Sequence, residues 1–197
     1  MSSIKIFCYN VKMEKDSYKK LPLVASKLIS MVKKDQEMRK KWANSGFDEN
    51  KYDSSIDKKN EQQLKKIVDK IGWPTITTVG EEASTAAWLL IQHLGHNSSF
   101  QKMMLKKMKK LALKDIDQKQ IAKLEDRILL LEGKPQLYGT SFNINLETKK
   151  LTVDPIYDIK NIDKRRKKMG LDSFKAHKKR AFEGYKKYQK KQKRKII

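Results

Sequence analysis

The segment Ala83–Leu94 constrains the fold more than any other, because its apolar residues lie on almost every side of a helix. A helix of this kind is stable only where neighbouring elements cover it all round. Its alanines allow those neighbours to approach closely, and Gly95 is a natural terminator. The sequence therefore predicts a mainly α fold built around a buried central helix.

Four more segments repeat apolar residues at the spacing of an amphipathic helix. They run from Leu21 to about Trp42, through Leu64–Ile71, over Phe100–Leu113 and over Gln118–Glu132. Together with the central segment they predict a bundle of about five helices. The polar, turn-rich residues 44–60 are predicted to form a loop.

The apolar repeat changes from helical to alternating after Gly133 and Pro135. One face of the alternation holds Tyr138, Thr140, Phe142, Ile144 and Leu146, and Leu151–Val153 returns after a turn at Glu147–Lys150. This pattern predicts a small β-hairpin. The β-branched and aromatic segment Ile4–Tyr9 is typical of a short strand.

Charge divides the chain unevenly. The protein has 197 residues, with 46 Lys or Arg against 23 Asp or Glu and a net charge of +23. Residues 160–197 hold 17 of the basic residues and three acidic ones, a net charge of +14. We therefore expect an N-terminal segment at 1–19, a helical domain with the hairpin at 20–159, and a basic C-terminal arm at 160–197.

The basic arm is predicted to bind a polyanion, with nucleic acid as the expected partner. The candidate contacts are Lys164, Arg165, Arg166, Lys167, Lys168, Lys178, Lys179, Arg180, Lys186, Lys187 and Arg194. Phe182, Tyr185 and Tyr188 follow one another at helical spacing, and their rings suit stacking on unpaired bases. The alternative is that Phe174 and Phe182 dock the arm on the domain and leave its charge solvated. A membrane surface is the competing partner, but the arm has few apolar residues and no lipidation motif.

Several classes of protein are disfavoured by what the sequence lacks. Cys8 is the only cysteine, so the chain forms no internal disulfide and no thiolate zinc cluster. The first residues lack the apolar core of a secretory signal, and Ala86–Ile91, the longest apolar stretch, is too short to cross a bilayer. We therefore expect a cytoplasmic protein without a membrane span. No motif identifies a cofactor or a metal site, and nothing predicts the oligomeric state.

Polar residues inside apolar segments are the candidates for chemistry. They are Asp35, His93, Asp126, Arg127, Gln136 and Tyr138. Each also has a structural interpretation. Asp35 and Arg39 have the i,i+4 spacing of an ion pair, and Asp126 with Arg127 would form a buried pair between helices. His93 and His96 are a weak metal signal, because Gly95 breaks the helix that would align their rings.

A set of short motifs resembles a bacterial domain-of-unknown-function family. Over residues 20–171 the chain contains KDQEMR, IGWPT, VGEEAS, AAWLLIQH, FQKMML, LEDR, EGKPQLYGT and NIDKRRKKMGL. Members of the family carry DQxxR, GWPT…VG…AAWL…QH, DR and QLYGTQ. The resemblance implies a shared polar set of Asp35, Gln36, Arg39, His93, Asp126, Arg127, Gln136, Tyr138, Gly139 and Thr140. Ser141 stands where the family usually has Gln, and the strong charge of residues 160–197 is not typical of it.

Two hypotheses for function follow. The first is a nucleic-acid-associated protein, RNA- or ribosome-bound, anchored through the basic arm. The second is a hydrolase- or transferase-like enzyme acting on a phosphate-rich substrate. In that enzyme His93 would be the general acid or base, Asp126 its orienting carboxylate, and Arg127 or Arg39 an anion clamp. The same polar set would equally serve as a satisfied network in a helical core.

Overall fold

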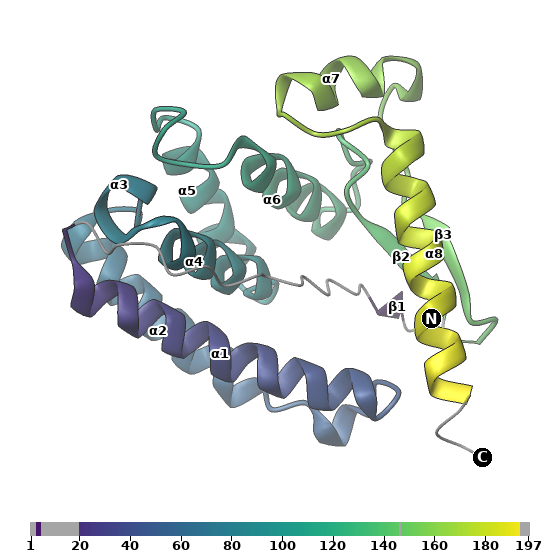
Figure 1. Ribbon diagram of the computed structural model, residues 1–197, viewed down its shortest axis with the longest axis horizontal. Helices are drawn as coiled ribbons and strands as arrows, with labels where there is room; N and C mark the ends of the chain where they lie inside the picture. The colour runs from purple at the N-terminus through teal and green to yellow at the C-terminus, as the bar shows by residue number, and fades with distance from the viewer. Residues whose placement is uncertain (1–2, 5–19, 146, 194–197) are drawn as a thin grey trace. The chain divides into compact units, whose positions relative to one another are not determined.

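The structure, a computed structural model, describes residues 3–4, 20–145 and 147–193, without the side chains of residues 3–4 and 191–193 (Figure 1). These residues form eight α-helices, two 3-10 helices and three short strands, which confirms a mainly α fold. The chain divides into two compact units. One comprises Lys12–Asp117, and the other comprises Met1–Val11 with Gln118–Ile197. The helical domain predicted at 20–159 spans parts of both.

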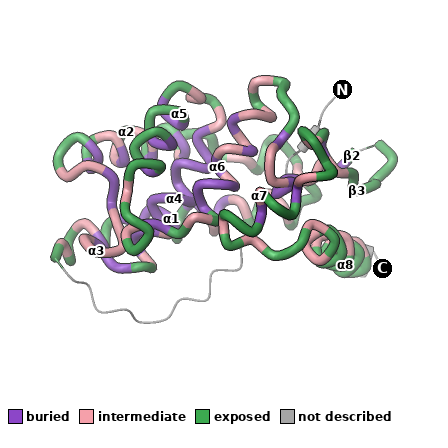
Figure 2. The backbone as a smooth tube through the Cα atoms, turned by 90° about the horizontal axis from the view of Figure 1, so that it is seen from above, coloured by how far each residue is buried: buried purple, intermediate pink, exposed green. Residues whose placement is uncertain are grey.

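The first unit is a bundle around a central helix, as the sequence predicts. Its helices are α1 (Pro22–Asn44), α2 (Ser54–Ile71), α3 (Ile76–Val79), α4 (Glu81–His93) and α5 (Ser98–Met108). Helix α4 packs against α1, α2, α3 and α5, and ten of its 13 residues are buried. Figure 2 shows α4 as an almost continuous buried segment. Burial on all sides explains why its apolar residues surround the helix axis.

Helix α2 begins ten residues before its first buried leucine, so the prediction of a loop over 44–60 is wrong for much of that range. A 3-10 helix covers Glu49–Lys51, and α2 starts at Ser54. The carboxylate of Asp53 accepts a hydrogen bond from the backbone N–H of Ser55 at 2.9 Å and caps the helix. The buried face of the first turns is polar, with Asp57 and Asn60, and an apolar repeat therefore does not reveal it.

The second unit contains helix α6 (Gln118–Leu131) and a three-stranded antiparallel sheet. Its strands are β1 (Ser3–Ile4), β2 (Phe142–Asn145) and β3 (Lys150–Val153), in the order β1-β2-β3. The predicted hairpin is confirmed, with Phe142 opposite Val153 and Asn145 opposite Lys150. The predicted strand at Ile4–Tyr9 is represented by Ile4, which lies opposite Ile144. Residues 5–9 and Leu146 lie outside the described residues.

Tyr138 and Thr140 do not extend the hairpin, although they continue its alternation. They lie in the loop that runs from Pro135 into β2. Gly139, between them, has a positive φ of 63°, which an extended strand does not allow. The alternating pattern before Phe142 is therefore not a strand.

Residues 160–193 form two helices in the second unit, α7 (Ile162–Lys168) and α8 (Phe174–Lys193). Helix α8 packs on the hairpin (Figure 1). The Phe182 ring meets the Phe142 ring edge-on, with centroids 6.2 Å apart. The Tyr185 hydroxyl donates to the backbone carbonyl of Lys149 at 3.0 Å, and the side-chain amide of Gln189 donates to the same oxygen at 2.8 Å. None of the helices in the described ranges is long and apolar enough to cross a membrane.

Candidate functional site

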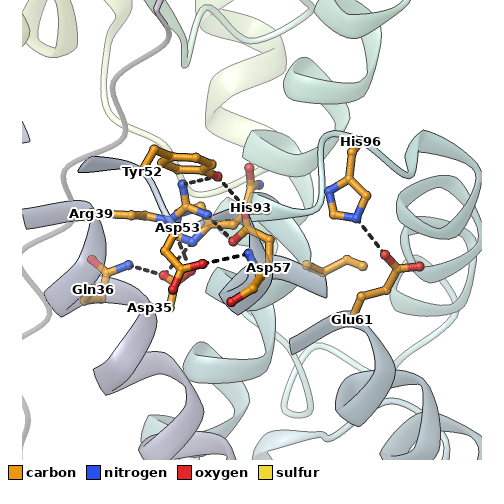
Figure 3. Close-up of polar contacts among 12 residues, drawn as sticks. Asp35, Gln36, Arg39, Tyr52, Asp53, Asp57, Glu61, His93 and His96 are labelled. Atoms are coloured by element: carbon orange, nitrogen blue, oxygen red, sulfur yellow. Dashed lines mark hydrogen bonds and ion pairs between the residues drawn. The ribbon is translucent and has the colours of Figure 1, made fainter. Parts of the chain in front are cut away.

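A buried polar network in the first unit joins α1, α2 and α4 (Figure 3). At its centre the Nδ1 atom of His93 lies 2.7 Å from Oδ2 of Asp35. The His93 side chain is 5% exposed and that of Asp35 is fully buried. An ionised carboxylate only accepts hydrogen bonds, so Nδ1 of His93 carries a proton whether the ring is neutral or charged.

Asp35 is held in its ionised form by three donors. Besides His93, the Nε2 atom of Gln36 donates to it at 2.9 Å and Nε of Arg39 donates at 3.1 Å. Burial alone would raise the pKa of Asp35. The hydrogen bond from His93, the charge of the His93 ring when it is protonated, and the charge of Arg39 outweigh burial and leave this pKa below its ordinary value. The i,i+4 pair of Asp35 and Arg39 expected from the spacing is present.

Arg39 bridges two carboxylates. Its Nη2 atom donates to Oδ1 of Asp57 at 2.6 Å, while its Nε binds Asp35. Burial would lower the pKa of Arg39, but the charges of Asp35 and Asp57 raise it above its ordinary value. The guanidinium is therefore already neutralised by ion pairs. This arrangement gives no support to Arg39 as a clamp for an anionic substrate.

Tyr52 completes the network beside Asp57. Its hydroxyl donates to Oδ2 of Asp57, and its ring packs against Trp42 with centroids 4.9 Å apart. Burial, followed by the hydrogen bond to Asp57, raises the pKa of Tyr52 to about 12. Sequence reasoning did not identify Tyr52 or Asp57, because both lie in the range predicted as a loop. The Asp53-Ser54-Ser55 start of α2 was the available signal, since Asp is a preferred N-cap residue.

The two histidines near the end of α4 bind different carboxylates. Nε2 of His96 lies 2.7 Å from Oε2 of Glu61, whereas His93 binds Asp35. Glu61 also accepts from Lys65 and from Asn97, each at 2.6 Å. The hydrogen bond from Lys65 is the largest influence and, with those from His96 and Asn97, lowers the pKa of Glu61 to about 2 against the effect of burial. Among the described residues, no group of three His, Cys, Asp or Glu side chains could hold a metal ion.

Asp126 lies in the second unit, where it holds the loop before β2. Its carboxylate accepts from the backbone N–H of Leu137 at 2.7 Å, of Tyr138 at 3.0 Å and of Thr140 at 2.9 Å, and from the Thr140 hydroxyl at 2.9 Å. Burial raises the pKa of Asp126 in spite of these bonds. The carboxylate that orients His93 is thus Asp35, and the role expected of Asp126 falls to a residue of α1.

The other candidates in the second unit also hold this loop. Nε2 of Gln136 donates to the carbonyls of Ser141 and Asp154, both at 3.1 Å, and its Oε1 accepts from the Ser141 N–H at 3.0 Å. The Tyr138 hydroxyl lies 3.3 Å from Glu125. Arg127 is half-buried on α6. These contacts are structural ties, and the catalytic roles expected from the sequence stay predictions.

Two of the predicted nucleic-acid contacts point into the protein. Arg166 is 1% exposed; its guanidinium donates to the carbonyls of Tyr138 at 2.5 Å and Asp172 at 2.6 Å. Arg165 donates to the carbonyl of Leu137 at 2.8 Å. A buried guanidinium cannot reach a phosphate in solvent, so the prediction is wrong for Arg166. Its charge instead satisfies carbonyls that would otherwise be buried without donors.

The remaining predicted contacts that the structure describes are exposed. They are Lys164, Lys167 and Lys168 on α7 and Lys178, Lys179, Arg180, Lys186 and Lys187 on α8. Lys175 and Lys190 are also exposed on α8; Lys190 begins the basic run 190–195, whereas Lys175 lies outside the basic runs of the sequence. Arg180 pairs with Asp172 at 2.7 Å, and Lys179 lies 4.0 Å from Glu183. Arg194 lies outside the described residues.

One family model matches the chain. It is described as a family of unknown function (DUF6624), and it matches residues 22–188. The expected resemblance to a family of unknown function is therefore confirmed. The match includes α7 and most of α8, so the basic segment lies largely within the family's extent. The comparisons found no similar curated protein and no similar solved structure.

Proposed function

We propose that this chain, which belongs to the DUF6624 family of unknown function, binds nucleic acid through one face of α8. Four exposed lysines define the α8 basic face: Lys175, Lys179, Lys186 and Lys190. This arrangement is the observation that carries the proposal. The positions i, i+4, i+11 and i+15 fall within about 60° of the helix circumference and extend over about 22 Å. Such a row places several positive charges where one phosphate backbone meets them together.

The side of α8 next to the α8 basic face is used for packing, which fixes the orientation of that face. Phe182 contacts Phe142, and the His177 ring lies 5.3 Å from the same ring, centroid to centroid. Tyr185 and Gln189 both bind the Lys149 carbonyl. Aromatic and hydrogen-bonded contacts hold this side of the helix on the hairpin, and the four lysines beside it are exposed to solvent.

The α8 basic face has little acidic charge to offset it. Among the residues that the structure describes, Lys175, Lys186 and Lys190 form no ion pair, and Lys179 has only the 4.0 Å contact with Glu183. An exposed pair at that distance contributes little binding energy. The lysines are therefore available to replace the counterions of a polyanion, and that exchange supplies most of the affinity for a phosphate backbone.

A membrane surface fits the α8 basic face less well than nucleic acid does. Interfacial helices bury an apolar face in the lipid, but the apolar side of α8 is occupied by the hairpin and its solvent side is lysine. Attraction to anionic lipid would then be purely electrostatic. At physiological salt we expect stronger binding to nucleic acid than to anionic vesicles.

The test uses a variant in which the four lysines of the α8 basic face become Gln. Its control replaces Lys33, Lys40, Lys58 and Lys66, four exposed lysines of α1 and α2, so that both variants lose equal charge. Binding to a fluorescent nucleic acid and to anionic vesicles is measured by anisotropy and by co-sedimentation. The proposal predicts a large loss of nucleic-acid affinity for the α8 variant alone. Equal losses for both variants, or tighter binding to vesicles, would overturn it.

A second candidate function, acid–base catalysis, is favoured by the buried pair of His93 and Asp35. A carboxylate on Nδ1 fixes the tautomer in which Nε2 of the neutral ring accepts a proton. Because Arg39 is paired with Asp35 and Asp57, a neutral substrate suits this site better than a phosphate. Nitrogen-15 NMR of the histidine rings, assigned with His93→Gln, should show a proton on Nδ1. An unprotonated Nδ1, or equal hydrolysis of chromogenic esters by wild type and His93→Gln, would remove this candidate.

A further inference from the structure

We infer that the nucleic acid bound by the α8 basic face is double-stranded. This inference rests on the proposed function and specifies its partner. The aromatic residues interleaved with the lysines suggested stacking on unpaired bases, which is typical of proteins that bind single strands. Whether these rings can stack on bases depends on the contacts that they already make in the structure.

The two phenylalanines of α8 are used inside the second unit. A Cβ atom placed on Gly139 would lie 2.7 Å from Cε2 of Phe174, so this ring lies directly against the Gly139 backbone. Phe182 packs edge-on against Phe142, and Nζ of Lys178 lies 5.7 Å from the centroid of its ring. Both phenylalanines are partly buried by these contacts, so stacking on a base would compete with packing inside the unit.

The two tyrosines of α8, Tyr185 and Tyr188, contact each other, and Tyr185 also binds the hairpin. Their rings stack with centroids 6.2 Å apart and planes 21° apart. The Tyr185 hydroxyl is bound to the Lys149 carbonyl, and both side chains are only partly exposed. A base that displaced Tyr185 would break a contact that holds α8 on the hairpin, and a base that separated the two rings would replace an existing stack.

Without stacking, the phosphate contacts supply the affinity. Stacking contributes about 1–3 kcal/mol per base to single-strand binding. Binding through the α8 basic face lacks this contribution. The counterion contribution is larger for a duplex, with a salt slope of about 0.9 per contact compared with about 0.7 for a single strand. A duplex also presents its phosphates at fixed positions. A helical row of lysines about 22 Å long can therefore meet a duplex without the entropic cost of ordering a flexible strand.

Tyr157 offers the competing arrangement. It is 58% exposed in the same unit, and the Arg165 guanidinium lies 5.8 Å from the centroid of its ring. If the unit binds single strands, this ring is where a base would stack. Tyr157→Ala therefore serves as the second variant in the test, alongside the variant of the four lysines.

The experiment compares a short DNA duplex with an unstructured single strand that has the same number of phosphates, by fluorescence anisotropy over a range of salt. We expect the wild-type protein to bind the duplex roughly tenfold more tightly than the single strand, or better, at physiological salt. Tyr157→Ala should bind the duplex with the wild-type affinity. Equal or tighter binding of the single strand, or a loss of single-strand binding in Tyr157→Ala, overturns the duplex inference while the proposed function stands. If neither probe binds, or if the variant of the four lysines binds both as well as wild type does, the proposed function fails as well.

Discussion

The Nδ1 atom of His93 lies 2.7 Å from Oδ2 of Asp35, and the two residues are 58 positions apart in the chain. Their contact ties the C-terminal end of α4 to the middle of α1. Arg39 extends it to Asp57 on α2, so three helices share one buried charged network. A network of this kind stabilises the fold only while every member keeps its partner.

Asp35→Ala should therefore be among the most destabilising single changes in the first unit. It leaves Arg39 without one of its two carboxylates and removes the acceptor for Nδ1 of His93, at an expected cost of about 3–5 kcal/mol. Urea unfolding followed by circular dichroism measures this cost. Glu37→Ala, an exposed position on the same helix, is the control and should change stability by about 0.5 kcal/mol or less. A similar small effect for both variants would show that the network does not stabilise the bundle.

Glu61 should make the stability of the first unit depend on pH in the acid range. Its pKa is lowered from 4.5 to about 2 in the folded protein, so folding favours the ionised form. The stabilisation is present above about pH 4.5 and is lost as the pH falls towards about 2. The difference in unfolding free energy between wild type and Glu61→Gln should shrink over this window. A difference that stays constant between these pH values would contradict the assigned role.

Gly139 should tolerate a side chain less well than Gly133, although both have positive φ angles of 63° and 71°. Alanine at either position has the backbone strain of the left-handed region, about 1–2 kcal/mol. At Gly133 the new Cβ meets nothing within 4 Å, whereas at Gly139 it meets Phe174 and Ile162 at 2.7 and 2.9 Å. We expect Gly139→Ala to cost a further ~1–3 kcal/mol, because α7 and α8 must shift. Equal melting temperatures for the two variants would contradict this packing.

The fold was predictable from the sequence where an apolar repeat marks the buried face. Helices α1, α4 and α6 lie close to their predicted ranges, because α1 and α6 each bury a stripe of apolar residues and α4 is apolar and buried nearly all round. The first turns of α2 were missed, since their buried side chains are Asp57 and Asn60. Their burial depends on partners from another helix, such as Arg39. The local sequence around α2 does not show which residues those partners are.

The sequence identified residues of the candidate site, but it did not show which of them bind one another. Asp35 and His93 were both named from the sequence, but spacing alone does not show which carboxylate meets which ring. Asp126 was equally suited to that role until the structure showed its oxygens occupied by the N–H groups of Leu137, Tyr138 and Thr140. In the basic segment, net charge did not distinguish the buried Arg166 from the exposed Lys167.

The salt dependence of nucleic-acid binding tests the central claim most directly. Each lysine that meets a phosphate contributes about 0.9 to the slope of log K against log salt concentration on a duplex. Replacing Lys175, Lys179, Lys186 and Lys190 with Gln should therefore reduce the slope by about 3–4. The variant of Lys33, Lys40, Lys58 and Lys66 should keep the wild-type slope. An unchanged slope in the α8 variant, with the protein folded, would contradict nucleic-acid binding through the α8 basic face.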